Sequence, residues 1–203
     1  IKRLFFRYAL PSTVRRAGML VTISDAVKEQ LIKSFDISSE FVHVVSIGVE
    51  RVVESPNLPK EPLTIFYPAA TYPHKNHEVL IAAFNRIAQK HRTVQLVLSG
   101  GKGRAEKEIR RSVSTSSAKE RIFLTGRISS KEIESILKSS ALLAFPSTYE
   151  GFGIPVLEAM AAGVPLLVAK GTPAEKLPGG KTIRVEPYEI DEWVEAIEML
   201  IID

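Results

Sequence analysis

Residues 141–168 read ALLAFPSTYEGFGIPVLEAMAAGVPLLV, and this stretch decides the fold class that the sequence predicts. The apolar runs at 141–145 and 165–168 are short and continuous, which is typical of strands buried on both faces of a sheet. Between them, residues 154–162 predict a helix that ends at Gly163, a residue type favoured just past a helix C-terminus. A strand, a crossover helix and a second strand make a parallel βαβ unit.

The same alternation of strand and helix continues on both sides of this unit. Short apolar runs predict further strands at 19–23, 41–45, 63–67, 94–98, 121–124 and 182–185. Helical patterns occur at 26–35, 76–90 and 104–113, after Ser129, and from Ile190 onward. With right-handed crossovers, these elements give an open, doubly wound parallel α/β sheet of the Rossmann type. Ligands bind such sheets beyond the carboxyl ends of the strands, so the loops after the strands should form one functional edge.

Three helix starts carry local capping signals. Ser24 is a typical N-cap residue ahead of its helix. Ser129 and Glu132 have the spacing of a capping box, in which the two residues cap each other's backbone. The segment Thr172–Glu175 repeats this spacing with a proline at the first helical position, so it predicts another capping box.

The segment between residues 49 and 62 divides the chain. It is polar and contains Pro56, Pro59 and Pro62, and proline disfavours both helix interiors and central strands. We therefore predict a first part at residues 1–58, which ends in a linker, and a second domain at residues 59–203.

Composition excludes several classes of protein. The chain has 203 residues, no cysteine and a net charge of +4, so disulfides and thiolate chemistry are excluded. No apolar run approaches the ~18 residues of a membrane span. The basic residues are scattered and the aromatic residues fall mainly in predicted strands and helices, which argues against a nucleic-acid partner. A cytoplasmic location is expected.

The first residues of the chain leave two interpretations open. Phe5, Phe6 and Tyr8 alternate with basic residues, and five basic residues lie in this part of the chain: Lys2, Arg3, Arg7, Arg15 and Arg16. Such a segment could contact anionic lipid at the inner face of a membrane or a phosphorylated partner. It could equally be a helix whose apolar side packs on structure outside this chain.

Two glutamates and a glycine-rich loop form the strongest candidate site. Glu150 lies just past a predicted strand, and Glu158 lies eight positions later inside the following helix. Gly151 and Gly153 let the backbone approach a ligand closely. The helix that begins near Ile154 offers N–H groups and the positive end of its dipole, which suits a phosphate. On spacing alone, the glutamates could be one solvated loop acid and one acid on a helix face.

The loop after the predicted strand at 63–67 supplies a cation to the same edge. Lys75 there could neutralise a diphosphate and stabilise a departing nucleotide. His74 and His77 are three positions apart, but no third metal ligand lies nearby in the sequence, and the chain has no Asp-x-Asp pair. We predict no metal site and no cofactor.

The string at 150–163 resembles the E-x7-E signature of retaining glycosyltransferases with the GT-B fold, in particular the large family 4, also called glycosyl transferases group 1. The resemblance covers nearly the whole chain. Residues 17–25 resemble the last strand of that family's N-terminal domain, residues 44–50 resemble the segment leading to the interdomain linker, and residues from Leu63 onward resemble the C-terminal, donor-binding half.

This resemblance implies roles for individual residues. Glu150 would contact the donor sugar, Glu158 would bind ribose hydroxyls, and Lys75 would bind the donor diphosphate. The backbone amides that would hold the diphosphate are those of Gly151, Phe152 and Gly153, with Ile154 adjoining. The nucleobase would be clamped by backbone atoms of Arg127 and Ile128.

The sequence departs from the family at one position of this site. Ala69-Ala70 stands where the family usually has a second cation, an arginine. His74 or Arg127 could take its place. The glycine-rich segment 100–103 could line the donor pocket or only turn the chain.

The implied activity is transfer of a hexose from a nucleotide diphosphate sugar to a glycan or lipid-linked acceptor, with retention of anomeric configuration. This chain would supply the donor site, and an N-terminal domain outside it would supply the acceptor site. We therefore expect the chain alone to bind nucleotide and to transfer sugar poorly. The alternatives are a non-catalytic nucleotide-binding or interaction domain and a sugar-nucleotide epimerase of the GT-B type.

Overall fold

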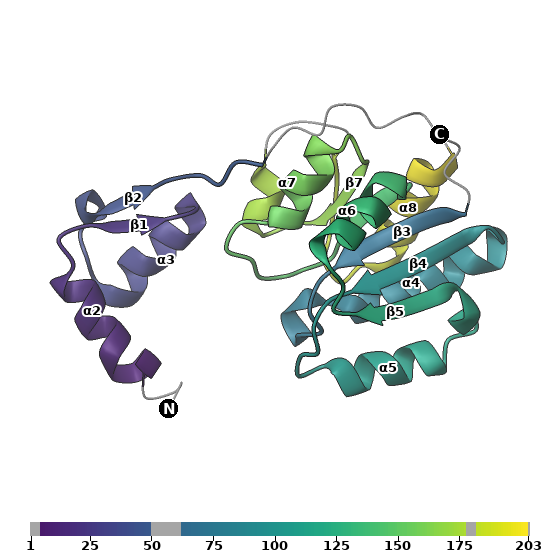
Figure 1. Cartoon of the computed structure of the whole chain (residues 1–203), viewed down its shortest axis with the longest axis horizontal. Coiled ribbons are helices and arrows are strands. Elements are labelled where there is room, and N and C mark those ends of the chain that lie inside the picture. The colour runs from purple at the N-terminus through teal and green to yellow at the C-terminus, as the bar shows by residue number, and fades with distance from the viewer. Residues whose placement is uncertain (1–4, 50–61, 178–181, 203) are drawn as a thin grey trace. The chain divides into compact units, whose positions relative to one another are not determined.

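The computed structural model describes residues 5–49, 62–177 and 182–202 (Figure 1). The chain divides into two compact units, residues 1–48 and residues 49–203. The boundary predicted between residues 58 and 59 lies outside the described residues.

The first unit is small and contains two short parallel strands. Its elements are a π-helical turn at Phe5–Ala9, α2 (Leu10–Arg16), β1 (Leu20–Thr22), α3 (Asp25–Phe35), a 3-10 turn at Ser39–Phe41 and β2 (Val42–Val44). Strands β1 and β2 pair in parallel, with Leu20 opposite Val42. Ser24 caps α3 as predicted, because its side chain accepts a hydrogen bond from the Val27 N–H at 3.2 Å.

The second unit is built on a six-stranded parallel sheet in the order β5-β4-β3-β6-β7-β8. The strands are β3 (Leu63–Pro68), β4 (Val94–Ser99), β5 (Ile122–Gly126), β6 (Leu142–Phe145), β7 (Leu166–Ala169) and β8 (Thr182–Val185). The chain runs outward from β3 to β5, then crosses back to β6 and runs outward the other way. This order confirms the predicted doubly wound sheet, and it places the topological switch point between β3 and β6.

Helices of the described residues cover both faces of this sheet (Figure 1). They are α4 (His77–Lys90), α5 (Glu106–Ser114), α6 (Ser130–Ser139), α7 (Ile154–Ala161) and α8 (Ile190–Ile202), with short 3-10 turns at Pro73–Lys75, Lys119–Arg121 and Pro173–Lys176. Because the two halves wind in opposite directions from the centre, right-handed crossovers put α4 and α5 on one face and α6 and α7 on the other.

The core of this unit joins the central strands to the helices on both faces. Phe66, Tyr67 and Phe145 from the central strands are fully buried, as is Phe84 of α4. Trp193 of α8 is also fully buried, and its indole Nε1–H donates to the Glu186 carbonyl at 3.0 Å. The continuous apolar runs of the sequence therefore correspond to strands covered on both sides.

One predicted capping box is present and the other is wrong. At Ser129 both hydrogen bonds of the box with Glu132 form. After Thr172 the chain makes only a 3-10 turn, and the Thr172 side chain caps nothing. Gly171 adopts a left-handed conformation with φ +84°, and its N–H donates to the Glu175 carboxylate at 2.6 Å. Glu175 therefore accepts a hydrogen bond from the backbone of Gly171, whereas the predicted capping box would have it bind the backbone of Thr172.

Helix α5 begins two residues later than the sequence predicts. The Ala105 N–H donates to the Thr71 carbonyl at 2.9 Å, so this backbone group binds the loop after β3. A contact with another strand's loop thus sets the helix start.

Candidate functional site

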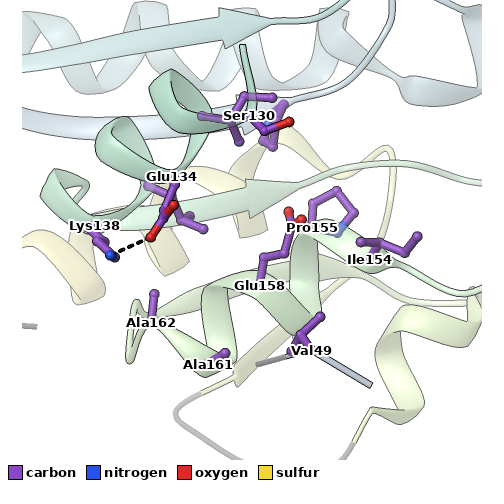
Figure 2. A pocket seen from close by; sticks show the side chains of 12 residues that line it. Val49, Ser130, Glu134, Lys138, Ile154, Pro155, Glu158, Ala161 and Ala162 are labelled. Atoms are coloured by element: carbon purple, nitrogen blue, oxygen red, sulfur yellow. Dashed lines mark hydrogen bonds and ion pairs between the residues drawn. The ribbon is translucent and has the colours of Figure 1, made fainter. Parts of the chain in front are cut away.

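A cavity of about 570 Å³ opens between α6 and α7, beside the end of β3 (Figure 2). Helix α6 lines it with Ser130, Ile133, Glu134 and Leu137, which follow helical spacing. Helix α7 contributes a second row, and Pro68 at the end of β3 completes this part of the wall; the α7 residues are Ile154, Pro155, Glu158, Ala161 and Ala162. The cavity therefore lies at the switch point of the sheet, where doubly wound folds bind ligands.

Glu158 is the acid of α7 that faces this cavity. Figure 2 shows its carboxylate beside Pro155. Burial raises the pKa of the Glu158 carboxyl above its ordinary value. In the described part of the chain, its carboxylate makes no hydrogen bond or ion pair, whereas Glu134 across the cavity is paired with Lys138 at 2.6 Å. Glu158 is thus a partly desolvated acceptor that is available to hydroxyl groups of a ligand.

The glycine-rich loop before α7 is shaped by Gly153. This residue has φ +111°, and a Cβ added to it would lie 2.7 Å from the Ala174 Cβ. Only glycine fits this conformation and this close approach. Phe152 is buried beside it, while Ile154 at the start of α7 is exposed. Packing against residue 174 therefore holds the segment 151–154 at the cavity edge.

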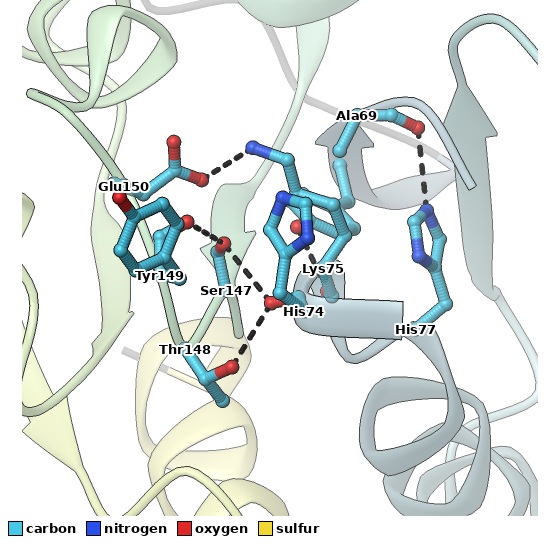
Figure 3. Close-up of polar contacts among 9 residues, drawn as sticks. Ala69, His74, Lys75, His77, Ser147, Thr148, Tyr149 and Glu150 are labelled. Atoms are coloured by element: carbon cyan, nitrogen blue, oxygen red, sulfur yellow. Dashed lines mark hydrogen bonds and ion pairs between the residues drawn. The ribbon is translucent and has the colours of Figure 1, made fainter. Parts of the chain in front are cut away.

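The loops after β3 and β6 are tied together at the same edge (Figure 3). The His74 carbonyl accepts hydrogen bonds from the Thr148 N–H at 2.8 Å and from the Ser147 and Thr148 hydroxyls at 3.2 Å each. Strands β3 and β6 are adjacent, so the loops that follow them meet. These hydrogen bonds join the two loops into one surface, although they lie far apart in the sequence.

Lys75 and Glu150 meet on this surface as an ion pair. The Lys75 Nζ lies 2.5 Å from the Glu150 Oε1, and the two side chains are only 19% and 13% exposed (Figure 3). The Lys75 Nζ also lies 6.0 Å from the centre of the Phe145 ring. The structure thus brings together Lys75, predicted to act on the diphosphate and the departing nucleotide, and Glu150, predicted to contact the donor sugar.

Two hydrogen bonds hold the chain in place at Lys75 and Asn76. The Tyr67 hydroxyl donates to the Lys75 carbonyl at 2.9 Å. Burial, and to a lesser degree the Glu150 charge, raise the Tyr67 pKa well above its ordinary value, so the hydroxyl stays protonated and remains a donor. Next in the chain, Asn76 has φ +50°, and its side-chain amide donates to the Pro187 carbonyl at 2.6 Å.

His74 lies beside the pair, and its ring is shaped by burial, by the Lys75 charge and by a neighbouring tyrosine. Burial and the Lys75 charge lower the His74 pKa below its ordinary value, so the imidazole is neutral near pH 7. Its ring stacks on Tyr72, with centroids 5.8 Å apart. The lowered pKa favours the neutral ring, and the suggestion that His74 takes the place of an arginine stays a prediction.

The other sequence-predicted positions lie around this surface. Arg127 and Ile128 follow β5 and immediately precede α6; Arg127 is exposed and Ile128 half-buried, and neither is among the described residues that line the cavity. Ala69 is buried, so an arginine at that position would need to displace its neighbours.

The glycine-rich segment 100–103 turns the chain against the loop after β3. A Cβ at Gly100 would lie 2.3 Å from the Ala69 carbonyl oxygen, and one at Gly103 would lie 2.4 Å from the Thr71 oxygen. These glycines are explained by backbone packing, and none of residues 100–103 is among the described residues that line the cavity.

Sequence reasoning missed the α6 wall of the cavity and two tyrosines. The signal for the wall was the helical spacing of residues 130, 133, 134 and 137, but its two apolar members, Ile133 and Leu137, are equally typical of the core-facing side of a helix. Tyr72 and Tyr149 flank His74 and are 39% and 56% exposed. Their exposure was not visible in the sequence.

His77, the first residue of α4, predicts a pH-dependent stability. Its side chain is 2% exposed, and burial lowers its pKa from 6.5 to about 4, although the nearby Ala69 carbonyl opposes this shift. The buried ring must be neutral, so its contribution is fully present above about pH 6.5 and is lost as the pH falls toward 4. The expected loss in unfolding free energy is about 3 kcal/mol.

Urea unfolding followed by the fluorescence of Trp193, the single tryptophan, measures this loss. The His77→Leu variant should lose this part of the acid dependence, whereas His43→Leu, at an exposed position of the first unit, should keep it. An unchanged acid dependence in His77→Leu would show that His77 does not cause it.

Comparison with known proteins shows the family to which this chain belongs. A family model described as glycosyl transferases group 1 matches residues 49–203. The chain belongs to this family. It is 25% identical over 200 residues to the O-antigen chain mannosyltransferase RfbU of Salmonella typhimurium, covering 98% of this chain and 55% of the relative. It is 28% identical over 193 residues to the MMP alpha-(1->4)-mannosyltransferase of Mycolicibacterium hassiacum, covering 92% of this chain and 46% of the relative.

Solved structures share the fold of this chain. A complex of Anabaena Alr3699/HepE with UDP and glucose matches 97% of the chain and 57% of that protein, with a TM-score of 0.80 and 21% identity. TarM matches 96% of the chain and 39% of that protein, with a TM-score of 0.78 and 18% identity. The chain spans about half the length of the curated relatives it matches. These transferase relatives do not favour the epimerase or non-catalytic alternatives.

The described residues contain neither a cluster of metal ligands nor a membrane-spanning helix. No group of three or more histidines or acids there is placed to hold a metal ion. No helix in that part of the chain is long and apolar enough to cross a bilayer.

Proposed function

We propose that this chain supplies the donor site of a retaining glycosyltransferase, which moves a hexose from a nucleotide diphosphate sugar to a glycan or lipid-linked acceptor. The observation that carries the proposal is the position of the Lys75–Glu150 pair. It lies at the switch point of the sheet, where the loop after β6 leads through the glycine segment into α7 and its cavity.

Lys75 is suited to the donor diphosphate. Its ammonium group is partly desolvated and is held by a single carboxylate, so an incoming diphosphate competes with Glu150 for the same charge. The start of α7 adds N–H groups and a positive dipole end. Together they stabilise the negative charge that develops on the leaving nucleoside diphosphate.

Glu150 changes partner when the donor binds. Once Lys75 turns to the diphosphate, the Glu150 carboxylate is free to accept hydrogen bonds from hydroxyls of the donor sugar. This exchange orients the sugar only when the diphosphate is in place. The resemblance to retaining family 4 enzymes supports this assignment.

The cavity between α6 and α7 would hold the nucleoside. Glu158 would accept hydrogen bonds from the ribose hydroxyls, and the loop at Arg127 and Ile128 would approach the base through its backbone. The Anabaena relative, which has the same fold, was crystallised with UDP, and this supports a nucleoside diphosphate as ligand.

The remaining parts of the proposal rest on the family. Most of the acceptor site would lie in a part of the enzyme outside this chain, so the chain alone would transfer sugar poorly. Lysine, amide groups and the helix dipole would hold the diphosphate without a metal ion. The relatives named for O-antigen synthesis support a role in polysaccharide assembly. The proposed location is the cytoplasm, at the inner face of a membrane.

Replacing Glu158 by glutamine tests the nucleoside part of the site. A nucleoside diphosphate should bind about tenfold more weakly, because charge-assisted hydrogen bonds to the ribose are lost. Inorganic pyrophosphate, which has no ribose, should bind both proteins equally. Calorimetric titration measures both ligands.

The exposed Glu195→Gln variant is the matched control on α8. If Glu158→Gln weakened the binding of pyrophosphate and of nucleoside diphosphate equally, the proposed contact between Glu158 and the ribose would be wrong. An unchanged nucleoside diphosphate affinity would place the nucleoside elsewhere.

A further inference from the structure

A second hollow lies on the opposite face of the sheet, beside α4 and α5. Its volume is about 340 Å³. Tyr72 and Pro73 of the loop after β3 form part of its wall, and charged side chains at the starts of the two helices line the rest, namely Glu78, Arg104 and Glu108.

These three charged groups are available to a ligand. Glu78, Arg104 and Glu108 are exposed, and with the rest of the described chain they make no ion pair and no side-chain hydrogen bond. The neighbouring Glu106 differs, because its carboxylate binds the Thr71 hydroxyl at 2.8 Å and the Arg110 Nε at 2.7 Å. The hollow thus presents two carboxylates and one guanidinium with unused hydrogen-bonding capacity.

A row of aromatic rings leads from this hollow to the Lys75–Glu150 pair. The rings of Tyr72 and His74 are stacked, with an interplanar angle of 12°. The His74 ring then meets the Tyr149 ring edge-on, with centroids 6.1 Å apart, and Tyr149 immediately precedes Glu150 in the chain. Ring-to-ring steps of 5.8 and 6.1 Å thus connect the hollow with the residue that precedes Glu150, where the transferred sugar is proposed to lie.

The chemistry of the hollow matches a neutral sugar ring. One face of a hexopyranose consists of C–H groups, which pack on an exposed aromatic face such as that of Tyr72. Its hydroxyls are both donors and acceptors, so they can pair with carboxylates and with a guanidinium at once. Two carboxylates against one arginine disfavour an anionic ligand.

We propose that this hollow is a saccharide subsite that takes a hexopyranose ring of the acceptor glycan. The assignment of the ring to the acceptor rests on the proposed function, because the donor would occupy the cavity on the other face.

Amide shift mapping of the chain with neutral glycosides tests the subsite. The probes are methyl α-D-mannopyranoside, methyl α-D-glucopyranoside and methyl α-D-galactopyranoside, each added first without and then with a nucleoside diphosphate. We expect at least one to produce saturable shifts at residues 72–78 and 104–108. Tyr72→Ala should weaken its binding about fivefold, equivalent to about 1 kcal/mol. Glu108→Gln should also weaken glycoside binding, although it removes no packing. Tyr8→Ala, at an exposed tyrosine of the first unit, should leave glycoside binding unchanged.

The absence of saturable shifts with all three glycosides would overturn the subsite, as would shifts confined to residues around Glu158. Equal affinity in Tyr72→Ala and the unaltered chain would overturn it too. Titration of the same samples with a nucleoside diphosphate measures binding at the donor site independently. Nucleotide binding without a saccharide response would therefore refute the subsite alone, and saccharide binding without nucleotide binding would refute the donor site alone.

Discussion

The Lys75→Met variant should bind a nucleoside diphosphate about 100-fold more weakly than the unaltered chain. The lysine supplies charge-assisted hydrogen bonds to the diphosphate, and their loss corresponds to about 3 kcal/mol. Part of the effect comes from Glu150, which is left unpaired close to the incoming negative charge. Calorimetric titration of single and double variants separates these contributions.

Glu150→Gln should act in the opposite direction on the same ligand. It releases Lys75 from its ion pair, so a nucleoside diphosphate should bind about threefold to tenfold more tightly. The double variant Lys75→Met/Glu150→Gln should recover part of the affinity lost in Lys75→Met. A nucleotide diphosphate sugar should gain less from Glu150→Gln, because that ligand also loses its contact with the glutamate.

An exposed ion pair provides the control for this series. Lys170 and Glu186 lie 2.8 Å apart, with side chains 42% and 48% exposed, so Lys170→Met should leave nucleotide affinity unchanged. If Lys75→Met and Glu150→Gln weakened nucleoside diphosphate binding to the same degree, the ion pair would serve only to hold the two loops together. The proposed exchange of partners would then be wrong.

Gly153→Ala should lower the unfolding free energy by about 3 kcal/mol. Its backbone has φ +111°, which strains any residue with a Cβ, and that Cβ would lie 2.7 Å from the Ala174 Cβ. Because the segment 151–154 would have to move, nucleotide affinity should fall as well. Urea unfolding followed by Trp193 fluorescence measures the stability change.

Gly171→Ala separates backbone strain from the steric contact. Gly171 also has a positive φ, +84°, but its added Cβ would have nothing within 4 Å, so the expected cost is about 1 kcal/mol. Adding Ala174→Gly to Gly153→Ala should recover the difference between the two variants. Equal destabilisation by Gly153→Ala and Gly171→Ala would show that the contact with Ala174 has no energetic weight.

The strands and the fold class were predictable because the relevant signals are local. The run at 141–145 is wholly apolar, and those at 63–67 and 94–98 each contain one polar residue, Thr64 and Gln95, because both faces of a parallel sheet are covered. The capping box at Ser129 was also predictable, because both of its partners lie within one helical turn. At Thr172 the same pattern failed, because the left-handed Gly171 offers its own N–H to Glu175.

The candidate site was only partly predictable. The sequence places Lys75 and Glu150 on one edge, but their contact depends on β3 lying beside β6, and strand order is not a local property. The need for glycine at position 153 arises from Ala174, which lies in a different segment. His74 was expected to act through its ring, whereas its carbonyl oxygen joins the two loops.

The central claim, that this chain holds a nucleotide-sugar donor site, is tested most directly by calorimetric titration with UDP, GDP and ADP, first without metal and then with magnesium. We predict saturable binding of one of the three at a single site, present without magnesium and lost in Lys75→Met. If none of them binds to chain that unfolds cooperatively by Trp193 fluorescence, the claim is contradicted.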